Sequence, residues 1–328
     1  MTWTTSGSSR RRSSLTCEGG DAGIPALGDR LAGMTSAPFG TVLTAMVTPF
    51  NEDGSVDLDG VQKVATYLVD HGNDGLIVSG TTGESPTTTG AEDGETLAAV
   101  KDAVGDRATI VAGVGTNDTR HSVELARQAE KVGADGLLLV TPYYNKPSQA
   151  GVLQHFRQVV EATSVPVMLY DVPGRTGTKI ALETYREVAT WDTVTSVKDA
   201  TGDLPRTAQL VDLGLAVYSG DDINTLGYLA YGATGVVSVV GHAAGTQLKA
   251  MIEAFLSGDH DEARRIHTSL IPAFEAVMGV PNYGATTAKA AMQLLGVLPN
   301  RTVRSPLMSL DDDELAALRT GLTAAGLL

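Results

Sequence analysis

Cysteine, aromatic side chains and long hydrophobic runs are all scarce in this sequence of 328 residues. The single cysteine, Cys17, excludes an intrachain disulfide and a metal cluster held by thiolates. No apolar run approaches the roughly 20 residues that a transmembrane helix needs, so we expect no membrane association. These absences are typical of a protein of the reducing cytoplasm, and we predict a cytoplasmic location.

Positive charge is also in short supply. The sequence has 24 lysine and arginine residues against 38 aspartate and glutamate residues, which gives a net charge of −14. Such a balance disfavours nucleic acids and anionic membrane surfaces as partners, and we expect neither.

Residues 1–35 differ in composition from the rest of the chain. They are rich in serine, glycine, threonine and arginine, and they include Arg10, Arg11 and Arg12. An arginine cluster can open a secretion signal, but no apolar segment of the required kind follows this one. We therefore predict a disordered N-terminal tail, and Met34 is a second candidate for the first residue.

Eight apolar segments recur along the chain and predict parallel strands. They start near Thr41, Gly75, Thr109, Gly136, Val165, Val194, Leu215 and Gly235, and the first runs from Thr41 to Phe50. They are continuously apolar, as strands covered on both faces are. Their spacing of about 20–35 residues leaves room for a helix after each strand. The pattern predicts a (β/α)8 TIM barrel over residues 36–243.

A doubly wound open sheet is the alternative fold. It would need a glycine-rich fingerprint after its first strand, and TPFNEDGS is not one. After Gly241 the strand signal ends, and residues 248–256, 262–278, 286–295 and 311–325 have helical patterns. We predict a helical C-terminal extension over residues 244–328 without a separate function.

The candidate nucleophile is a lysine within an apolar strand. Lys198 follows Val194 and Val197 and precedes the turn Asp199-Ala200-Thr201-Gly202. Burial disfavours the charged amine and lowers its pKa, and the commonest use of such a lysine is a Schiff base with a carbonyl substrate. An ordinary strand-end lysine that reaches water is the alternative, so the neighbouring strand ends decide between the two.

Catalytic groups of a TIM barrel lie at the carboxyl ends of its strands. The other strands end near the hydroxyl residues Thr81, Thr82, Tyr144 and Tyr170, and Arg175 follows the fifth strand. The turn around Thr81 and Thr82 can present backbone N–H groups to a carboxylate, and an arginine can grip a second one. Each residue alone has an ordinary structural explanation, but together at one end of the barrel they predict a site.

Other chemistry finds less support in the sequence. No pair of histidines has the spacing of metal ligands, and only His242 follows a predicted strand closely, so no metal site is expected. A serine hydrolase would need a G-x-S-x-G elbow, which is absent. The glycines of residues 232–245 fit a phosphate site or close packing equally well. Asp221 and Asp222 are expected to cap the helix that follows them.

Five motifs together resemble a known family. GTTGES, PYYNKPSQ, YDVPGRTG, VKDATG and SGDD occur in the order and spacing of the dihydrodipicolinate synthases, which belong to the N-acetylneuraminate lyase superfamily. The resemblance runs from about Gly40 to the C-terminus. It implies a pyruvate-dependent class I aldolase that condenses pyruvate with L-aspartate-4-semialdehyde to 4-hydroxy-tetrahydrodipicolinate, in lysine and diaminopimelate biosynthesis. It also implies a homotetramer built as a dimer of dimers and no organic cofactor or metal.

The resemblance assigns catalytic roles by position. Lys198 would form the imine with pyruvate, and Tyr170 would be the general acid and base at that imine. Thr81 would link Tyr170 to Tyr144 in a proton relay, which a phenol needs because its pKa near 10 makes it a poor base alone. In this family the second tyrosine of the pair reaches into the neighbouring subunit's site, so Tyr144 implies at least a dimer.

Four further residues would bind the substrates. Thr82 and Val237 would hold pyruvate, with Gly220 beside that pocket, and Arg175 would bind the carboxylate of the semialdehyde. Sialic-acid lyases resemble this chain at the lysine and the tyrosine but lack that arginine, whereas an aldolase of keto-sugar acids stays open as an alternative. A regulatory barrel with a vestigial site is the non-enzyme alternative, which the complete set of site residues disfavours.

One family property, feedback inhibition by lysine, is expected to be weak or absent here. Lysine-sensitive members carry a histidine and a glutamate at the positions that correspond to Gly90 and His121. Asn117 and Tyr143 match the family at the same regulatory site.

Overall fold

The computed structural model describes residues 1–2, 37–281 and 283–328. Residues 37–281 and 283–328 belong to one compact unit. Apart from its first two residues, the tail predicted over residues 1–35 lies outside the described residues, and so does Met34.

Eight parallel strands close into a barrel in the order of the sequence. The strands are β1 Val42–Ala45, β2 Gly75–Val78, β3 Thr109–Gly113, β4 Gly136–Val140, β5 Val167–Asp171, β6 Val194–Asp199, β7 Ala216–Ser219 and β8 Gly235–Ser238. The ring closes where Val42 and Leu43 of β1 pair with Val236 and Val237 of β8. This closure confirms the predicted TIM barrel, and every strand starts within two residues of its predicted position.

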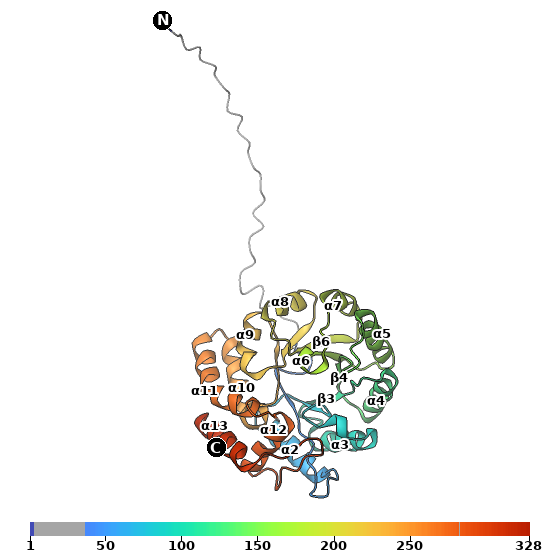
Figure 1. The fold of residues 1–328 in the computed structure, drawn as a ribbon, viewed down its shortest axis with the longest axis vertical. Coiled ribbons are helices and arrows are strands. Elements are labelled where there is room, and N and C mark those ends of the chain that lie inside the picture. The colour runs from blue at the N-terminus through green and yellow to red at the C-terminus, as the bar shows by residue number, and fades with distance from the viewer. Residues whose placement is uncertain (3–36, 282) are drawn as a thin grey trace. The chain divides into compact units, whose positions relative to one another are not determined.

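Helices encircle the strands, as Figure 1 shows. They are α2 Leu58–Asp70, α3 Gly90–Val104, α4 Thr119–Val132, α5 Gln149–Val160, α6 Pro173–Thr176, α7 Leu182–Val188, α8 Leu204–Asp212, α9 Thr225–Ala230, α10 Gly241–Leu256, α11 His260–Met278, α12 Ala285–Leu294 and α13 Asp312–Ala324, with short 3₁₀ turns η1 Ser85–Thr87 and η2 Asp222–Asn224. The Ser148 hydroxyl accepts from the Gly151 N–H at 3.3 Å, which confirms the predicted N-cap of α5.

The strands are apolar throughout because both of their faces are buried. On β1, Leu43 and Ala45 belong to a cluster inside the barrel, whereas Val42 packs outward against the C-terminal helices. Successive side chains of a strand point to opposite faces, so both faces of each strand must be apolar. The outer layer, with Val64 and Leu68 of α2 among its members, forms the largest core cluster.

The first strand is shorter than the predicted segment Thr41–Phe50 because it ends at Ala45. The Met46 N–H still donates to the Ile77 carbonyl at 3.0 Å, but the Val47 N–H donates to Nε2 of His242 at 3.1 Å. The segment stays buried while its backbone leaves the strand ladder. An apolar run therefore gave the burial correctly and the strand length incorrectly.

The last four helices include the predicted C-terminal extension. Helix α11 packs against α10 and α13, and α12 packs against α10. Their core cluster includes Val42 and Val236 of the barrel strands, so the helices share a core with the barrel. The division at residue 243 stays a prediction. It falls next to Ala244, where φ −123° and ψ 22° kink α10.

Candidate active site

Lys198 and Tyr170 face each other across two neighbouring strands. Tyr170 of β5 is paired with Lys198 of β6, and Lys198 is paired in turn with Tyr218 of β7. The Lys198 amine lies 4.4 Å from the centre of the Tyr170 ring, and both side chains are buried. The two residues predicted to carry the chemistry are therefore adjacent in space.

The surroundings of Lys198 favour an uncharged amine. Burial lowers the pKa of Lys198 from 10.5 to about 8, Asp222 partly opposes this effect, and the Arg175 charge adds to it. In the described part of the chain, no hydrogen bond or ion pair is made by the Lys198 amine. With a pKa of about 8, a minor fraction of this amine is neutral near physiological pH, and that fraction can attack a carbonyl carbon.

Tyr170 is a protonated phenol in this site. Burial raises the pKa of Tyr170 to about 12, while the charge of Arg175 lowers it and Tyr283 raises it. A phenol with so high a pKa holds its proton at neutral pH, so it can donate one but removes one only with a partner that accepts the charge.

The loop after β2 forms a tight turn at the same end of the barrel. The Gly83 N–H donates to the Gly80 carbonyl at 3.0 Å, and the Glu84 N–H donates to the Thr81 carbonyl at 3.1 Å. Between these bonds Thr82 is buried and Thr81 is exposed. The sequence predicted this turn, and the structure adds that Glu84, whose side chain is buried, closes it through its backbone N–H.

A pocket of about 270 Å³ opens above Tyr170. Its lining includes Thr81, Tyr143, Tyr144, Tyr170, Arg175 and Thr176. Lys198 is not part of this lining, but its amine contacts the ring of Tyr170, which is. Within the described chain no hydrogen bond joins the hydroxyls of Thr81, Tyr170 and Tyr144, so the proton relay stays a prediction.

Tyr144 has two features that are unusual for a residue near a pocket. It is 89% exposed, and its φ of 72° places a non-glycine residue in the left-handed region. A large aromatic side chain held outward in this way is available to a second molecule.

Gly220 lies beside the lysine, and Val237 lies inside the barrel. A Cβ atom on Gly220 would meet the Ala200 Cβ at 2.8 Å and the Lys198 Cγ at 3.2 Å, so only glycine fits this close approach. Val237 of β8 is buried in the same interior cluster as Tyr170.

Arg175 has a neighbour that the sequence did not predict. Its guanidinium carbon lies 5.0 Å from the ring centre of Tyr283, in the loop that leads into α12. Tyr283 is 38% exposed, so the pair stands at the solvent side of the site. The only sequence signal was an aromatic residue in a loop punctuated by Pro281 and Gly284.

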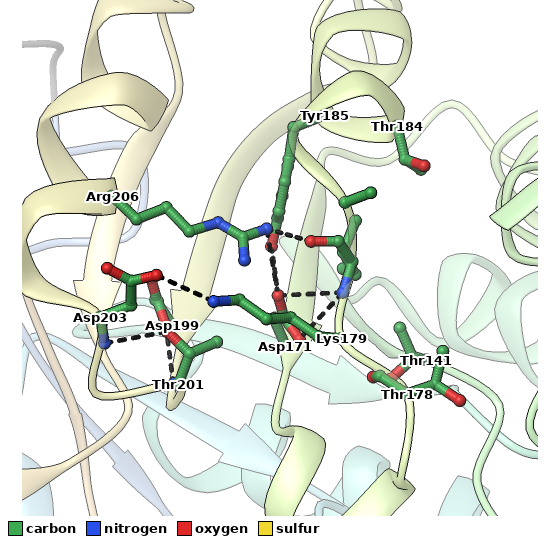
Figure 2. A network of polar contacts seen from close by, with 12 residues as sticks. Thr141, Asp171, Thr178, Lys179, Thr184, Tyr185, Asp199, Thr201, Asp203 and Arg206 are labelled. Carbon is green, nitrogen blue, oxygen red and sulfur yellow. Dashed lines mark hydrogen bonds and ion pairs between the residues drawn. The ribbon is translucent and has the colours of Figure 1, made fainter.

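Behind Tyr170 and Lys198 lies a buried polar network (Figure 2). The next residue of each strand, Asp171 and Asp199, points to the opposite side of the strand, toward the helices. Arg206 of α8 lies 3.5 Å from Asp171, and the Tyr185 hydroxyl donates to Asp171 at 3.3 Å. Burial raises the pKa of Asp171 to about 7, although Arg206 lowers it. This network fixes the ends of β5 and β6, and sequence reasoning did not find it.

The model of the dihydrodipicolinate synthetase family matches residues 38–325. This chain belongs to that family. The match contains every predicted site residue, and it continues through the C-terminal helices.

Individual members of the dihydrodipicolinate synthetase family are close to this chain. The 4-hydroxy-tetrahydrodipicolinate synthase of Acidothermus cellulolyticus is 59% identical over 291 residues, which cover 88% of this chain and 94% of that protein. Synthase 2 of Streptomyces coelicolor is 53% identical over 290 residues, or 88% of this chain and 96% of that protein. The solved dihydrodipicolinate synthase of Cyanidioschyzon merolae with lysine bound superposes with a TM-score of 0.85 at 40% identity, covering 89% of this chain and 99% of that one.

Three expectations about residues near the synthase site can be compared with the structure. Asp222 does not cap the helix that follows it, because its carboxylate accepts from the Ser238 hydroxyl and from the N–H groups of Val239 and Val240 at 2.9 and 3.1 Å. His242 is a core residue between the Val47 N–H and the Val239 carbonyl. A Cβ atom on Gly241 would lie 2.1 Å from the Thr44 hydroxyl, which favours close packing over a phosphate site.

Residues 1–2, 37–281 and 283–328 contain no group of three or more histidine, cysteine, aspartate or glutamate side chains placed to hold a metal ion. Within the same residues no helix is long and apolar enough to span a membrane. The predicted weakness of lysine feedback, based on Gly90 and His121, stays a prediction.

Proposed function

We propose that this protein condenses pyruvate with L-aspartate-4-semialdehyde to give 4-hydroxy-tetrahydrodipicolinate, as its synthase relatives are named for doing. The observation that carries the proposal is the buried Lys198 amine beside Tyr170, at the carboxyl ends of β5 and β6 in a member of this family. This amine has no hydrogen-bond or ion-pair partner among the residues that the structure describes. The protein is accordingly a lyase of the class I aldolase type.

The reaction begins with attack of the neutral Lys198 amine on the ketone carbon of pyruvate. Loss of water gives a protonated imine, and loss of a methyl proton then gives an enamine. The enamine carbon attacks the aldehyde carbon of the second substrate, which forms the new C–C bond and regenerates the imine. The amino group of the semialdehyde then displaces Lys198, which closes the ring and frees the enzyme.

Tyr170 is proposed to move the protons of these steps. The Lys198 amine lies 4.4 Å from the centre of the Tyr170 ring, and this proximity supports the role. Thr81 and Tyr144 are proposed to connect Tyr170 to solvent. The exposed, left-handed Tyr144 supports a contribution to the site of a second copy, and we propose a homotetramer built as a dimer of dimers.

Substrate binding is proposed to divide between two parts of the site. Thr82 and Val237 would hold pyruvate beside Lys198 and Gly220, while Arg175 would bind the carboxylate of the semialdehyde. Arg175 lines the pocket above Tyr170, which supports this division. No metal or organic cofactor is required by these steps, and the proposed location is the cytoplasm.

The test is a comparison of two aldehydes. Purified protein is incubated with pyruvate and either aspartate-4-semialdehyde or a sugar aldehyde, and pyruvate consumption is followed. Turnover with the semialdehyde is expected. Turnover only with the sugar aldehyde would instead identify an aldolase of keto-sugar acids, and turnover with neither would support a barrel that binds without catalysis.

A further inference from the structure

The loop that carries Thr81 and Thr82 ends at a residue in an unfavourable conformation. Glu84 has φ 60° and ψ 32°, in the left-handed region that non-glycine residues seldom occupy. Its side chain is 2% exposed, so a carboxylate is buried at the same place. Both features are costly and persist only where the surrounding structure holds them.

A buried cation from the C-terminal extension holds Glu84. The Lys289 amine, on α12, donates to Oε1 of Glu84 at 2.5 Å and to the Thr302 carbonyl at 2.8 Å. Lys289 is 1% exposed, and its amine lies 3.9 Å from the ring centre of Phe50 in the loop after β1. Burial lowers the pKa of Lys289 to about 8 although Glu84 raises it, so the amine still carries charge at neutral pH.

Arg304 also bonds to Glu84, at the carboxylate oxygen that Lys289 does not contact. Its backbone N–H donates to Oε2 of Glu84 at 2.9 Å. Its guanidinium pairs with Glu92 at 2.5 Å and donates to the Thr87 carbonyl at 2.7 Å. Both Glu84 oxygens are thus bonded to residues more than 200 positions later in the sequence than Glu84 itself.

We propose that Lys289 is a positioning residue for pyruvate. It sets the conformation of Glu84, and through the bond from the Glu84 N–H to the Thr81 carbonyl it sets the turn of Thr81 and Thr82. The C-terminal extension thereby controls keto-acid binding without touching the substrate. This inference rests on the proposed function, because it takes Thr82 as part of the pyruvate site.

Loss of the Lys289 charge leaves a buried carboxylate without its cation. Such a group must turn toward water or become protonated, because an unpaired buried charge is strongly unfavourable. Either response releases the left-handed turn. A displacement of about 1 Å at a substrate-positioning group lowers catalytic efficiency by about 100-fold, so we expect a loss of this order in kcat/KM for pyruvate.

The matched control is Lys249→Met. Lys249 of α10 also ties the C-terminal helices to the barrel, through an ion pair of 2.8 Å with Asp74. Asp74 precedes β2, whereas Glu84 follows it, so the two ion pairs lie at opposite ends of the barrel. Loss of the Lys249 pair therefore weakens the attachment of the extension without reaching the turn.

The experiment measures kcat and KM for pyruvate, together with the melting temperature, in Lys289→Met, Lys249→Met and the double variant Glu84→Gln/Lys289→Met. We expect a loss of about 100-fold in kcat/KM for pyruvate in K289M, a change of less than about twofold in K249M, and partial recovery in the double variant, where no charge is left unpaired.

Two results would overturn the proposal. One is a K289M enzyme that melts at a lower temperature but binds and turns over pyruvate like K249M, which would make Lys289 structural only. The other is a double variant as poor as K289M, which would contradict the charge argument. If K289M does not fold, Glu84→Gln is compared with K249M in the same way. An inactive wild-type protein would instead refute the proposed function.

Discussion

Two lysines of this molecule, Lys198 and Lys289, are both buried but differ in the partners of their amines. Burial lowers the pKa of both Lys198 and Lys289 to about 8. The Lys289 amine donates to the Glu84 carboxylate at 2.5 Å and to the Thr302 carbonyl at 2.8 Å. The Lys198 amine, in contrast, has no hydrogen-bond or ion-pair partner among the described residues. Burial alone therefore does not identify a nucleophile, and we expect it to do so only together with an amine that has no such partner.

The free amine of Lys198 depends on how nearby carboxylates are occupied. Asp171 and Asp199 follow the two active-site residues but point away from them, and Asp171 is bound by Arg206. Asp222 is bound by the Ser238 hydroxyl and by backbone N–H groups. Near Lys198, Asp171 and Asp222 are bonded to other groups, whereas near Lys289 the Glu84 carboxylate bonds directly to the amine.

Replacement of Lys198 is expected to give the largest effect. Lys198→Met should lower kcat by at least about 1000-fold, as the loss of a covalent nucleophile does in other enzymes. Turnover with pyruvate and aspartate-4-semialdehyde measures it. A variant that retains more than about a tenth of the wild-type rate would place the nucleophile elsewhere.

Replacement of Lys198 and of Lys289 should change the free energy of unfolding in opposite directions. Because folding lowers the pKa of Lys198 from 10.5 to about 8, the buried lysine reduces the free energy of unfolding by about 3 kcal/mol at pH 7. The folded pKa lies below the unfolded one, so this cost is complete below pH 8 and fades as the pH rises toward 10.5. In urea unfolding, K198M should be more stable than the wild type at pH 7, and this advantage should shrink at pH 10. K289M should be less stable than the wild type at pH 7. A destabilised K198M would contradict the comparison.

Tyr170→Phe should have the next largest effect on turnover. The phenol holds its proton until about pH 12 and is the proposed proton carrier at the imine. Loss of a general acid and base lowers rates by about 100-fold or more, while the imine itself can still form. Stopped-flow measurement of enamine formation against overall turnover checks this. An unchanged kcat would remove Tyr170 from the mechanism.

The pH dependence should report the Lys198 amine. Because only the neutral amine attacks pyruvate, kcat/KM should rise about tenfold per pH unit below pH 8 and level off above it. Asp222 raises the pKa of Lys198, so Asp222→Asn should shift the rising part of the kcat/KM profile to lower pH. A limb that levels off near pH 10 would mean that Lys198 is solvated like a surface lysine.

Tyr283 should have the smallest effect, confined to the second substrate. Loss of an exposed cation–π contact to Arg175 is worth about 0.5–1 kcal/mol, so Tyr283→Ala should raise KM for the semialdehyde about threefold. Tyr283→Phe, which keeps the ring, is the control and should behave like the wild type. A matching change in KM for pyruvate would show that the loop acts on the whole site.

The sequence predicted the parts of the molecule that local patterns encode. The barrel follows from eight apolar segments at βα spacing, and Lys198 and Tyr170 follow from the rule that barrel sites lie at strand ends. The length of β1 was wrong because the Val47 N–H bonds to His242, a residue far along the chain. Such a partner leaves no local signal.

The residues that sequence reasoning missed share one property. Glu84 and Lys289 are 205 positions apart, and Arg206 of α8 pairs with Asp171 at the end of β5. Glu84 belongs to a recognised motif, but nothing in that motif says which cation reaches it. Asp222 was expected to cap the next helix, as its position after a strand suggests, and tertiary contacts gave it another role. Long-range pairing of buried charges is visible only once the chain is folded.

Borohydride reduction in the presence of pyruvate, followed by peptide mapping, tests the central claim most directly. Reduction fixes any imine as a stable mass increase on the lysine that formed it. The account predicts a single labelled residue, Lys198, with Lys289 unlabelled although its pKa is equally low. Label on Lys289, or none on Lys198, would contradict the claim that a buried and unpartnered amine is the nucleophile.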